Sequence, residues 1–452
     1  MTIRLLCLAA SFIASSPLSA VTFNVTPTSD WPEMLNGPGF LQPGDKIVFG
    51  PGTYDIGQRK LIIKYRGTAT NPITLSAADG ANIVFTRDGQ QNVINLLGAQ
   101  HLKIKELEIT GGDRGIAIGN DGHIDSKFIT LDGNHIHHTG DAAVTANNVN
   151  TKYEGMHFIG NHIHDTGGHG EGFYVGCNDN KCQFFNGIIE KNYIHDLNDL
   201  RNGIYQGDGI EIKHGSYNNI IRDNVIHDTN YPAITVYGVE GQGGRNVIER
   251  NVMWDIDNHG IQVAADANVR NNIIFSSLYD GIHIQNHQAA VPGNLTIVNN
   301  TIRSNVGNNP KTSYISGHAI RITNPNGGTY SGPILLANNA LYPEGSEQAI
   351  HTYLAPPGIT SINNVGTGIA PELPFDSTGN LIDDFVDFLN KNAFPTVGSS
   401  LIGAANTSFQ PNNDFNTTSR SGSNDVGAYA YRAGGNTGWQ IGPKFKEFPA
   451  IN

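Results

Sequence analysis

One repeated pattern limits the folds open to this chain: a short apolar stretch followed by Asn-x-(Ile, Met or Leu), which returns about every thirty residues. The successive asparagines are 27, 31, 32, 27, 21, 28 and 39 residues apart. They are Asn134, Asn161, Asn192, Asn224, Asn251, Asn272, Asn300 and Asn339. A repeat of this length is typical of solenoids, in which each coil packs only against its neighbours. We therefore expect about eight stacked coils, with the Asn amides aligned in a ladder at one turn.

Each repeat also holds a second short segment of the form Gly-(apolar)-x-(apolar). It occurs at residues 115–118, 172–175, 209–212, 260–263 and 281–284, and as Ala-(apolar)-x-(apolar) at 319–322. Such alternation points two side chains inward and the one between them outward, as in a strand. The periods of three and four that a helix needs are missing. A barrel would not repeat one Asn at one turn, and propeller blades are longer. The pattern predicts an all-β fold, a single-stranded right-handed parallel β-helix. The residues expected to point inward are Ile210, Ile212, Ile234, Val236, Ile261, Val263, Ile282 and Ile284.

The two ends of the chain differ from the repeats, as solenoid ends must if they are to cover the core. Residues 1–20 resemble a secretory signal, with Arg4, an apolar stretch and a small-residue cleavage site. We expect residues 21–452 to form one domain, with central coils at about 100–345 and a C-terminal cap at about 380–452. Residues 31–35 are expected to form a short capping helix, and residues 382–389 a short amphipathic helix. The protein is accordingly expected to be secreted or periplasmic.

The charge balance is acidic. The chain carries 28 Lys and Arg against 40 Asp and Glu, and loss of the signal would change the net charge from −12 to −13. An acidic surface repels polyanions unless cations bridge them. No later segment is long and apolar enough to span a bilayer. We expect a monomer that has neither a nucleic-acid partner nor a membrane association.

Two cysteines remain after the predicted signal, Cys177 and Cys182. In an oxidising compartment such a close pair most simply forms a disulfide that closes a small loop. Zinc binding is the weaker interpretation, because two thiols without a second pair rarely hold that metal.

The outward positions of the Gly-(apolar)-x-(apolar) strand form two columns on one face. Aligned coil by coil, the first is Ala117, Ala143, Tyr174, Glu211, Thr235, Gln262, His283 and Arg321. The second is Gly119, Thr145, Gly176, Lys213, Tyr237, Ala264, Gln285 and Thr323. The residue just before the strand adds Glu171, Asp208, His259, Asp280 and His318. Small residues in the first coils give way to charged and aromatic ones in the middle, which suits a groove for a polymer. The alternative is that these are ordinary solvated side chains.

Histidines also recur beside the Asn repeat. Ile-His-Asp triplets contain His164, His195 and His227, and His137 and His138 lie in the preceding repeat. They look like a metal motif, but residues of a turn that repeats with each coil explain them more simply.

Two segments carry a resemblance to a known group. Gly44-Asp-Lys-Ile-Val-Phe-Gly-Pro-Gly-Thr-Tyr54, with Pro72-Ile-Thr-Leu75 after it, is similar to the opening of the β-helix polysaccharide lyases related to chondroitinase B and the alginate lyases. Glu211-Ile-Lys-His-Gly-Ser-Tyr-Asn-Asn-Ile-Ile-Arg-Asp-Asn224 resembles that group's coil of acid, Lys, Ser and Asn. The resemblance covers most of the chain as fold and is specific over about fifty residues.

The resemblance implies a calcium-assisted lyase. Asp208 and Glu211 would bind Ca²⁺, helped by Glu171, and Lys213 would be the base that removes a proton. Counted back from Asn224, Lys213 stands two residues earlier than the family Lys. No Arg occupies the matching place on the next coil, where His259 or His283 could act instead. Between two acids a Lys stays protonated, unless a cation compensates their charge and lowers its pKa.

The remaining roles follow from position. Tyr237, His259 or His283 would protonate the leaving oxygen, while Tyr174, Gln262, Gln285 and Arg321 would contact the sugar chain. We expect the Lys213 side chain to point to solvent and to support no core.

Three other functions stay open on the same fold. A glycoside hydrolase would use two carboxylates among Glu171, Asp208 and Glu211. A uronate C5-epimerase would share the proton abstraction of a lyase but leave the polymer intact. A non-enzymatic carbohydrate-binding or surface protein would use the groove for adhesion alone. Lys213 between acids favours the lyase or the epimerase.

Overall fold

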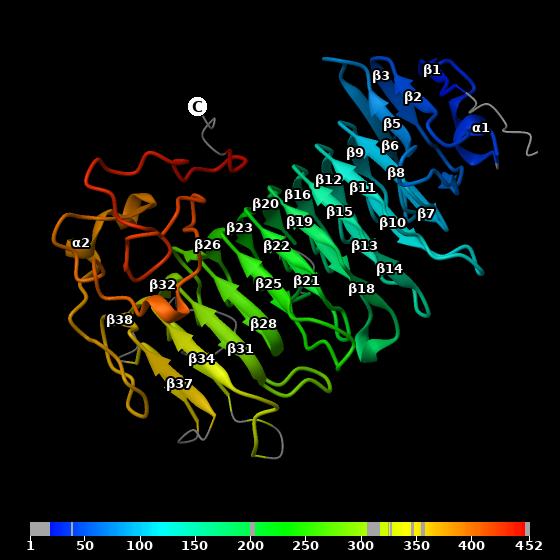
Figure 1. Cartoon of the computed structure of the whole chain (residues 1–452). Coiled ribbons are helices and arrows are strands. Elements are labelled where there is room, and N and C mark those ends of the chain that lie inside the picture. The colour runs from blue at the N-terminus through cyan, green and yellow to red at the C-terminus, as the bar shows by residue number, and fades with distance from the viewer. Residues whose placement is uncertain are drawn as a thin grey trace, which may run out of the picture.

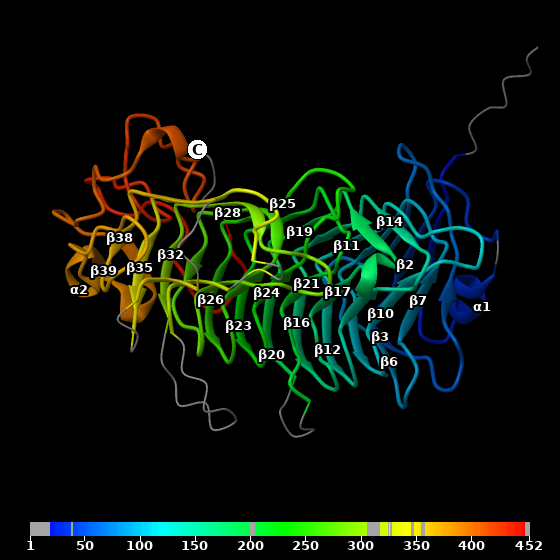
Figure 2. The same cartoon turned by 90° about the horizontal axis from the view of Figure 1, so that it is seen from below.

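The structure is a computed structural model that describes residues 19–37, 39–198, 204–304, 317–323, 325, 328–344, 348–353 and 358–447. Most of the predicted signal, residues 1–18, therefore lies outside the described residues. Short parallel strands are stacked coil upon coil from the N-terminal to the C-terminal end (Figure 1, Figure 2). This architecture is a parallel β-helix, as the repeats predict.

Three long parallel sheets run the length of the described coils, and we name them sheets A, B and C. The 13 strands of sheet A are β1 (Thr22–Val25), β2 (Lys46–Phe49), β5 (Ile73–Ala77), β8 (Leu102–Lys105), β11 (Thr130–Asp132), β15 (His157–Ile159), β19 (Ile188–Glu190), β22 (Ile220–Arg222), β25 (Asn246–Glu249), β28 (Ala265–Arg270), β31 (Gly293–Val298), β34 (Ile334–Ala337) and β37 (Ile359–Ile362). The 12 strands of sheet B are β3 (Gly52–Asp55), β6 (Ile83–Arg87), β9 (Glu108–Gly111), β12 (His135–Thr139), β16 (His162–Thr166), β20 (Tyr193–Leu197), β23 (Val225–Thr229), β26 (Val252–Ile256), β29 (Ile273–Ile274), β32 (Thr301–Ser304), β35 (Ala340–Pro343) and β38 (Val365–Gly366).

Sheet C contains the predicted Gly-(apolar)-x-(apolar) strands. Its 11 described strands are β4 (Ile62–Ile63), β7 (Ile94–Leu97), β10 (Ile116–Gly119), β13 (Val144–Ala146), β17 (Phe173–Val175), β21 (Ile210–Ile212), β24 (Ile234–Val236), β27 (Ile261–Val263), β30 (Ile282–Ile284), β33 (Ile320–Ile322) and β36 (Ile350–Thr352). All eight residues expected to point inward are buried in the core, at 0–1% exposure. Removal of these aliphatic side chains from water is the main stabilising contribution to each coil.

Stacking continues beyond the Asn repeats, so the expected number of about eight coils was too low. The strands β2, β5 and β8 of sheet A belong to early coils that lack the Asn signature at their turn. A coil does not require the Asn signature, because inward apolar residues such as Ile47 and Leu75 are enough to form one.

The predicted Asn ladder is present at the turn between sheets A and B. From Asn134 to Asn364, each Nδ2 donates to the Oδ1 of the Asn on the next coil, at 2.8–3.0 Å. The same Oδ1 accepts the backbone N–H of the preceding Asn, as between Asn161 and Asn192 at 2.9 Å. Each Nδ2 donates its second hydrogen to a carbonyl of sheet A, for example from Asn192 to Phe158 at 3.1 Å. These buried amides all have hydrogen-bond partners, so the fold avoids the free-energy penalty of burying unpaired polar groups.

The N-terminal end carries the expected capping helix, whereas residues of the C-terminal segment pack against the side of sheet B. The helix α1 (Trp31–Asn36) covers the first coils, with Trp31 packed edge-on against Tyr54 and Phe85. The helix expected at 382–389 was only partly right, because α2 (Leu381–Asp384) ends after one turn. Asp384 is buried there and accepts hydrogen bonds from Ser400 N and Tyr342 Oη. The chain then extends into β39 (Phe385–Asp387), which pairs with β40 (Asn392–Pro395).

The remaining elements are short. They are the pair β14 (Lys152–Glu154) and β18 (Gln183–Phe185), and the 3₁₀ turns η1 (Asn178–Asn180), η3 (Phe388–Asn390) and η4 (Thr407–Phe409). In the described part of the chain, no helix is both long and apolar enough to cross a bilayer.

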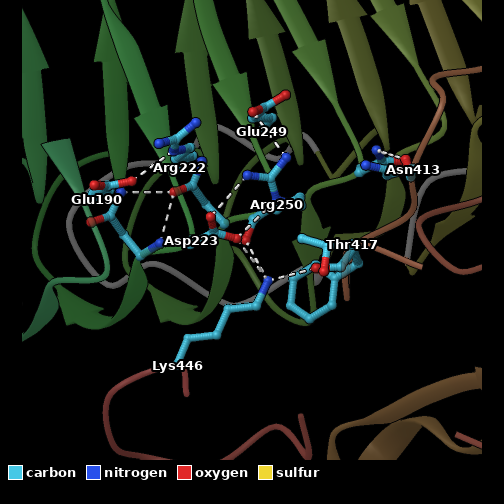
Figure 3. Close-up of polar contacts among 12 residues, drawn as sticks. Glu190, Arg222, Asp223, Glu249, Arg250, Asn413, Thr417 and Lys446 are labelled. Carbon is cyan, nitrogen blue, oxygen red and sulfur yellow. Dashed lines mark hydrogen bonds and ion pairs between the residues drawn. The ribbon is translucent and has the colours of Figure 1, made fainter. Parts of the chain in front are cut away.

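The C-terminal segment turns back along the coils (Figure 1), and one buried Lys helps to hold it there. Lys446 Nζ donates to the Phe415 carbonyl at 2.7 Å and contacts Asp223 Oδ1 at 3.2 Å (Figure 3). Burial lowers the pKa of Lys446 to about 8, while Asp223 opposes this. Asp223 also pairs with Arg250 at 2.9 Å, so the segment docks onto an ion-pair network of the central coils.

We predict that Asn192→Ala destabilises the fold by about 2–5 kcal/mol, because Asn161 loses the acceptor of two buried N–H groups. The measurement is the free energy of unfolding from denaturant titration. The exposed Asn412 provides the control, and Asn412→Ala should change this free energy by less than about 0.5 kcal/mol. Equal effects of the two substitutions would contradict a stabilising role of the ladder.

Candidate functional site

The predicted outward columns lie on the outer face of sheet C. The register joins Ala117 to Thr145, Thr145 to Tyr174 and Tyr174 to Glu211. The coil-by-coil comparison of the sequence predicts Ala143 in this column, which is wrong by two residues. Val144 pairs with Ile116, both side chains face the core, and this fixes Thr145 as the outward residue. From Glu211 the column continues through Thr235, Gln262, His283 and Arg321, as predicted.

Three acidic residues meet at β17 and β21, where Glu171 and Asp208 precede the strands and Glu211 lies on β21. Glu171, Asp208 and Glu211 each present a carboxylate oxygen, and these atoms lie within 4.8 Å of one another. All three side chains are buried, with exposures of 3%, 0% and 3%. Burial, followed by the charge of Glu211, raises the pKa of Glu171 to about 8 and the pKa of Asp208 well above its ordinary value.

Two oxygens of this acidic cluster have no hydrogen-bond partner among the described residues, although they are buried. They are Asp208 Oδ2 and Glu211 Oε2, while the other Asp208 oxygen accepts a hydrogen bond from the Thr235 hydroxyl. Leaving such oxygens unpaired is costly. Oxygen donors on neighbouring coils are the ligands of a hard divalent cation such as Ca²⁺, so the residues present fit that ion.

Lys213 lies beside the acids, but it is not the solvent-exposed side chain that we expected. It is 6% exposed, and its Nζ contacts Glu211 Oε1 at 2.5 Å and donates to Tyr237 Oη at 3.1 Å. The side chain is enclosed because the rings of Tyr174 and Tyr237 cover it, with centroids 4.6 and 5.0 Å from Nζ. Burial acts to lower the pKa of Lys213, but Glu211, Tyr174 and Asp208 outweigh it and raise that pKa.

A pocket of about 320 Å³ opens over this group. Its lining residues are Arg114, Asp141, Ala142, Thr145, Asn147, His169, Glu171, Tyr174, Asn178, Gln206 and Lys213. Tyr174 is only partly buried, in contrast to Tyr237, which is 3% exposed and donates to Glu211 Oε1 at 3.0 Å. The pocket therefore combines a Lys and an accessible phenol with buried carboxylates.

The loop between the two cysteines forms one wall of the pocket. Cys177 and Cys182 are joined in the structure, and Asn178 between them lines the pocket. Gln288 binds this loop, because its Nε2 donates to Asn178 Oδ1 at 2.6 Å and its Oε1 accepts from Asp179 N at 2.8 Å. The loop is thus held across several coils.

The predicted histidines belong to a second group farther along the groove. His283 Nδ1 is 2.8 Å from His259 Nε2 and 3.1 Å from Asp280 Oδ2, and Arg321 Nη1 is 3.8 Å from the same oxygen. Three strand steps separate Glu211 from His283, roughly 14 Å. The structure therefore does not bring His259 or His283 to Lys213. Gln262 lies between the two groups in the first column, and Gln285 extends the second column beyond Ala264.

Sequence reasoning missed Arg114 as a residue of the site. It occupies the position just before the sheet C strand, the same position as Glu171 and Asp208, so the column could have been extended two coils earlier, past Ala142. Arg114 pairs with Asp141 at 3.0 Å at the edge of the pocket. No repeated sequence pattern marks Asp141 as a residue of the pocket, because it lies in an irregular turn.

Comparisons with known proteins agree on the fold. The family described as a right handed beta helix region matches residues 80–241 and, in an overlapping match, 153–330, together more than half of the chain. Comparison with curated protein sequences gives no match.

Three solved structures illustrate the likeness. The complex structure of XylC with xylose has a TM-score of 0.59 at 12% identity, covering 90% of this chain and 98% of that one. Pectate lyase Pel9A has a TM-score of 0.52 at 14% identity, covering 91% and 96%. A mutant of the PL6 family alginate lyase AlyGC also has 0.52, at 16% identity, covering 86% and 58%. At these identities the likeness shows the fold, and the predicted resemblance to β-helix polysaccharide lyases is confirmed at that level.

We predict that Glu171→Gln stabilises the calcium-free protein at alkaline pH. The folded-state pKa of about 8 lies above the ordinary 4.5, so the stability tied to the protonated carboxyl is complete below pH 4.5 and is lost as the pH rises to 8. Thermal unfolding with a chelator should show no gain near pH 4.5 and a gain of a few kcal/mol above pH 8. Glu154→Gln, in a partly exposed pair with Lys127, should show no such pH dependence. An unchanged melting temperature of Glu171→Gln above pH 8 would argue against a buried, repelled carboxylate.

Proposed function

The chain belongs to the right-handed β-helix family, and we propose that it is a polysaccharide lyase that cleaves a uronic-acid-containing polymer by β-elimination. The observation that carries the proposal is a single Lys held between phenols and buried carboxylates at the floor of a pocket. Polysaccharide lyases occur among the solved structures of this fold, including pectate lyase Pel9A and the alginate lyase AlyGC. We further propose that the protein acts outside the cytoplasm, since residues 1–20 have the features of a secretory signal.

Recognition of a uronate needs positive charge in the pocket. Arg114 supplies one permanent charge, and its Nε is buried without a hydrogen-bond partner among the described residues. Tyr174 offers an apolar ring face for a sugar, as stacking sites for carbohydrates commonly do. Asn178 and Gln206 add amides at the rim for the sugar hydroxyls.

We propose that the acidic cluster of Glu171, Asp208 and Glu211 holds Ca²⁺. The two buried carboxylate oxygens without partners support this, because bound oxygen ligands would no longer be orphaned. When bound, the cation would attract the uronate carboxylate, compensate the acids and thereby lower the pKa of Lys213.

In the proposed reaction, neutral Lys213 takes the C5 proton of the uronate. The C5–H electrons form the C4=C5 double bond, and the C4–O bond to the leaving sugar breaks. Tyr174 donates its proton to the departing oxygen, and it is better placed than Tyr237, whose hydroxyl is buried against Glu211. Proton transfer from Lys213 to Tyr174 restores both groups.

The geometry favours this reaction over hydrolysis. A glycosidase needs two carboxyl groups that both reach the scissile bond, whereas the three side chains of the acidic cluster are only 0–3% exposed. A C5-epimerase would use the same base but would return a proton to C5 in place of cleavage. The products separate these functions, because only a lyase yields unsaturated oligosaccharides.

We predict that Lys213→Arg lowers the rate of unsaturated-product formation by about 10² to 10⁴, the usual cost of losing a general base. Arg keeps the charge beside Glu211, and hence the fold, but is not deprotonated in proteins. Product absorbance should be followed on alginate, pectate and glycosaminoglycans, with the melting temperature as a test of folding.

Lys105→Arg is the matched control, since Lys105 pairs with Asp132 on sheet A away from the pocket. If the Lys213→Arg variant formed unsaturated products at the rate of the unmodified protein, Lys213 would be excluded as the base. Saturated products from the unmodified protein would instead support a hydrolase with paired carboxylates.

We predict that chelation abolishes turnover and that Ca²⁺ restores it. The cation should also stabilise the fold by about 2.7 kcal/mol at a hundredfold excess over its dissociation constant, and unfolding curves would measure this. Asp208→Asn should remove the stabilisation, whereas Asp132→Asn on sheet A should keep it. Full activity in excess chelator would count against the cation.

A further inference from the structure

Sheet B carries a second candidate metal site, built from nitrogen instead of oxygen. The expectation that the recurrent histidines are turn residues was wrong, because all five lie on strands of sheet B: His137, His138, His164, His195 and His227. The rings of all but His138 stack from coil to coil, with centroids 5.0 Å apart. Ring stacking can be explained by side-chain packing alone. Whether the histidines can bind a metal therefore depends on the partners of their ring nitrogens.

Carboxylates fix which nitrogen of each ring carries the proton. His164 Nδ1 lies 2.6 Å from Asp165 Oδ2, and His137 Nε2 lies 3.2 Å from Glu108 Oε1. An ionised carboxylate only accepts hydrogen bonds, so these two nitrogens donate and the opposite nitrogens keep their lone pairs. A ring held on one side by a carboxylate, with a lone pair on the other, is the arrangement of metal-binding histidines.

The free lone pair of His164 faces another imidazole. His135 Nε2 is 2.7 Å from His164 Nε2. A ring nitrogen from each of three residues, His135, His137 and His164, lies within 4.8 Å of the other two. Zinc bound at about 2.0–2.1 Å to each nitrogen would need the nitrogens roughly 3.3 Å apart, a movement of less than 1 Å for the close pair.

The next coil repeats only part of this arrangement. His162 Nε2 lies 2.8 Å from His195 Nε2, and Asp196 holds the other nitrogen of His195. Phe445 of the C-terminal segment packs against the His162 ring, with centroids 6.0 Å apart. No third ligand is grouped with this pair among the described residues.

We propose that His135, His137 and His164 bind one divalent transition metal of the zinc class, with Asp165 and Glu108 orienting two of the rings. Imidazole ligands select such metals, whereas the acidic cluster on sheet C offers only oxygen and suits calcium. The metal would link the coils that contain β12 and β16 and is independent of the proposed lyase reaction.

Calorimetric titration of the full chain with ZnCl₂ near pH 7, in excess Ca²⁺, tests the proposal. One Zn²⁺ per chain is expected. His164→Gln should abolish binding, and Asp165→Asn should weaken it about 10- to 100-fold, as loss of an orienting carboxylate does. His195→Gln is the matched control, since it removes the equivalent stacked ring one coil away and should leave the affinity unchanged.

Melting temperatures measured without zinc would show that each variant folds. The proposal is overturned if the unmodified chain binds no zinc, or if His164→Gln and His195→Gln weaken binding equally. It is also overturned if binding survives His164→Gln but is lost in His283→Gln, which would place the metal in the histidine group of sheet C.

Discussion

Every other feature of this structure depends on hydrogen bonding between successive coils. A parallel β-helix buries its turns as well as its strands, so polar groups at an inner turn must find partners within the protein. The Asn ladder meets this requirement, because each amide uses both of its hydrogens and its oxygen between adjacent coils. These hydrogen bonds between coils fix the register of the strands, since a shift by one residue would leave amides unpaired and expose inward aliphatic side chains.

Fixed register gives the outer faces their chemistry. Residues far apart in sequence, such as Tyr174, Glu211 and Thr235, become neighbours at one strand spacing. The same rigidity allows three carboxylates to be buried close together, at a cost visible in the pKa of Glu171, which burial and then the charge of Glu211 raise. Strain of this kind, stored beside a Lys in a pocket, is typical of sites that bind a cation or move a proton.

Different faces of one solenoid thus present different donors. Sheet C gathers carboxylates, phenols and Lys213, whereas sheet B stacks imidazoles whose proton positions are set by neighbouring acids such as Asp165. Hard oxygen donors and softer nitrogen donors select different metals. A periodic backbone therefore separates chemistries by face, without any change in the coil itself.

The sequence by itself determined the fold, the Asn ladder, the inward aliphatic columns and, except at the coil of Thr145, the residues that face outward on sheet C, because a period of two and a repeated turn leave few alternatives. It also identified Glu171, Asp208, Glu211 and Lys213 as one group. Only the tertiary structure decided that Lys213 is buried beneath two tyrosines, that Arg114 joins the pocket and that His283 lies three strands away from Glu211. Burial and side-chain direction depend on the neighbouring coils and on the Cys177–Cys182 loop, whose position across the groove no local pattern encodes.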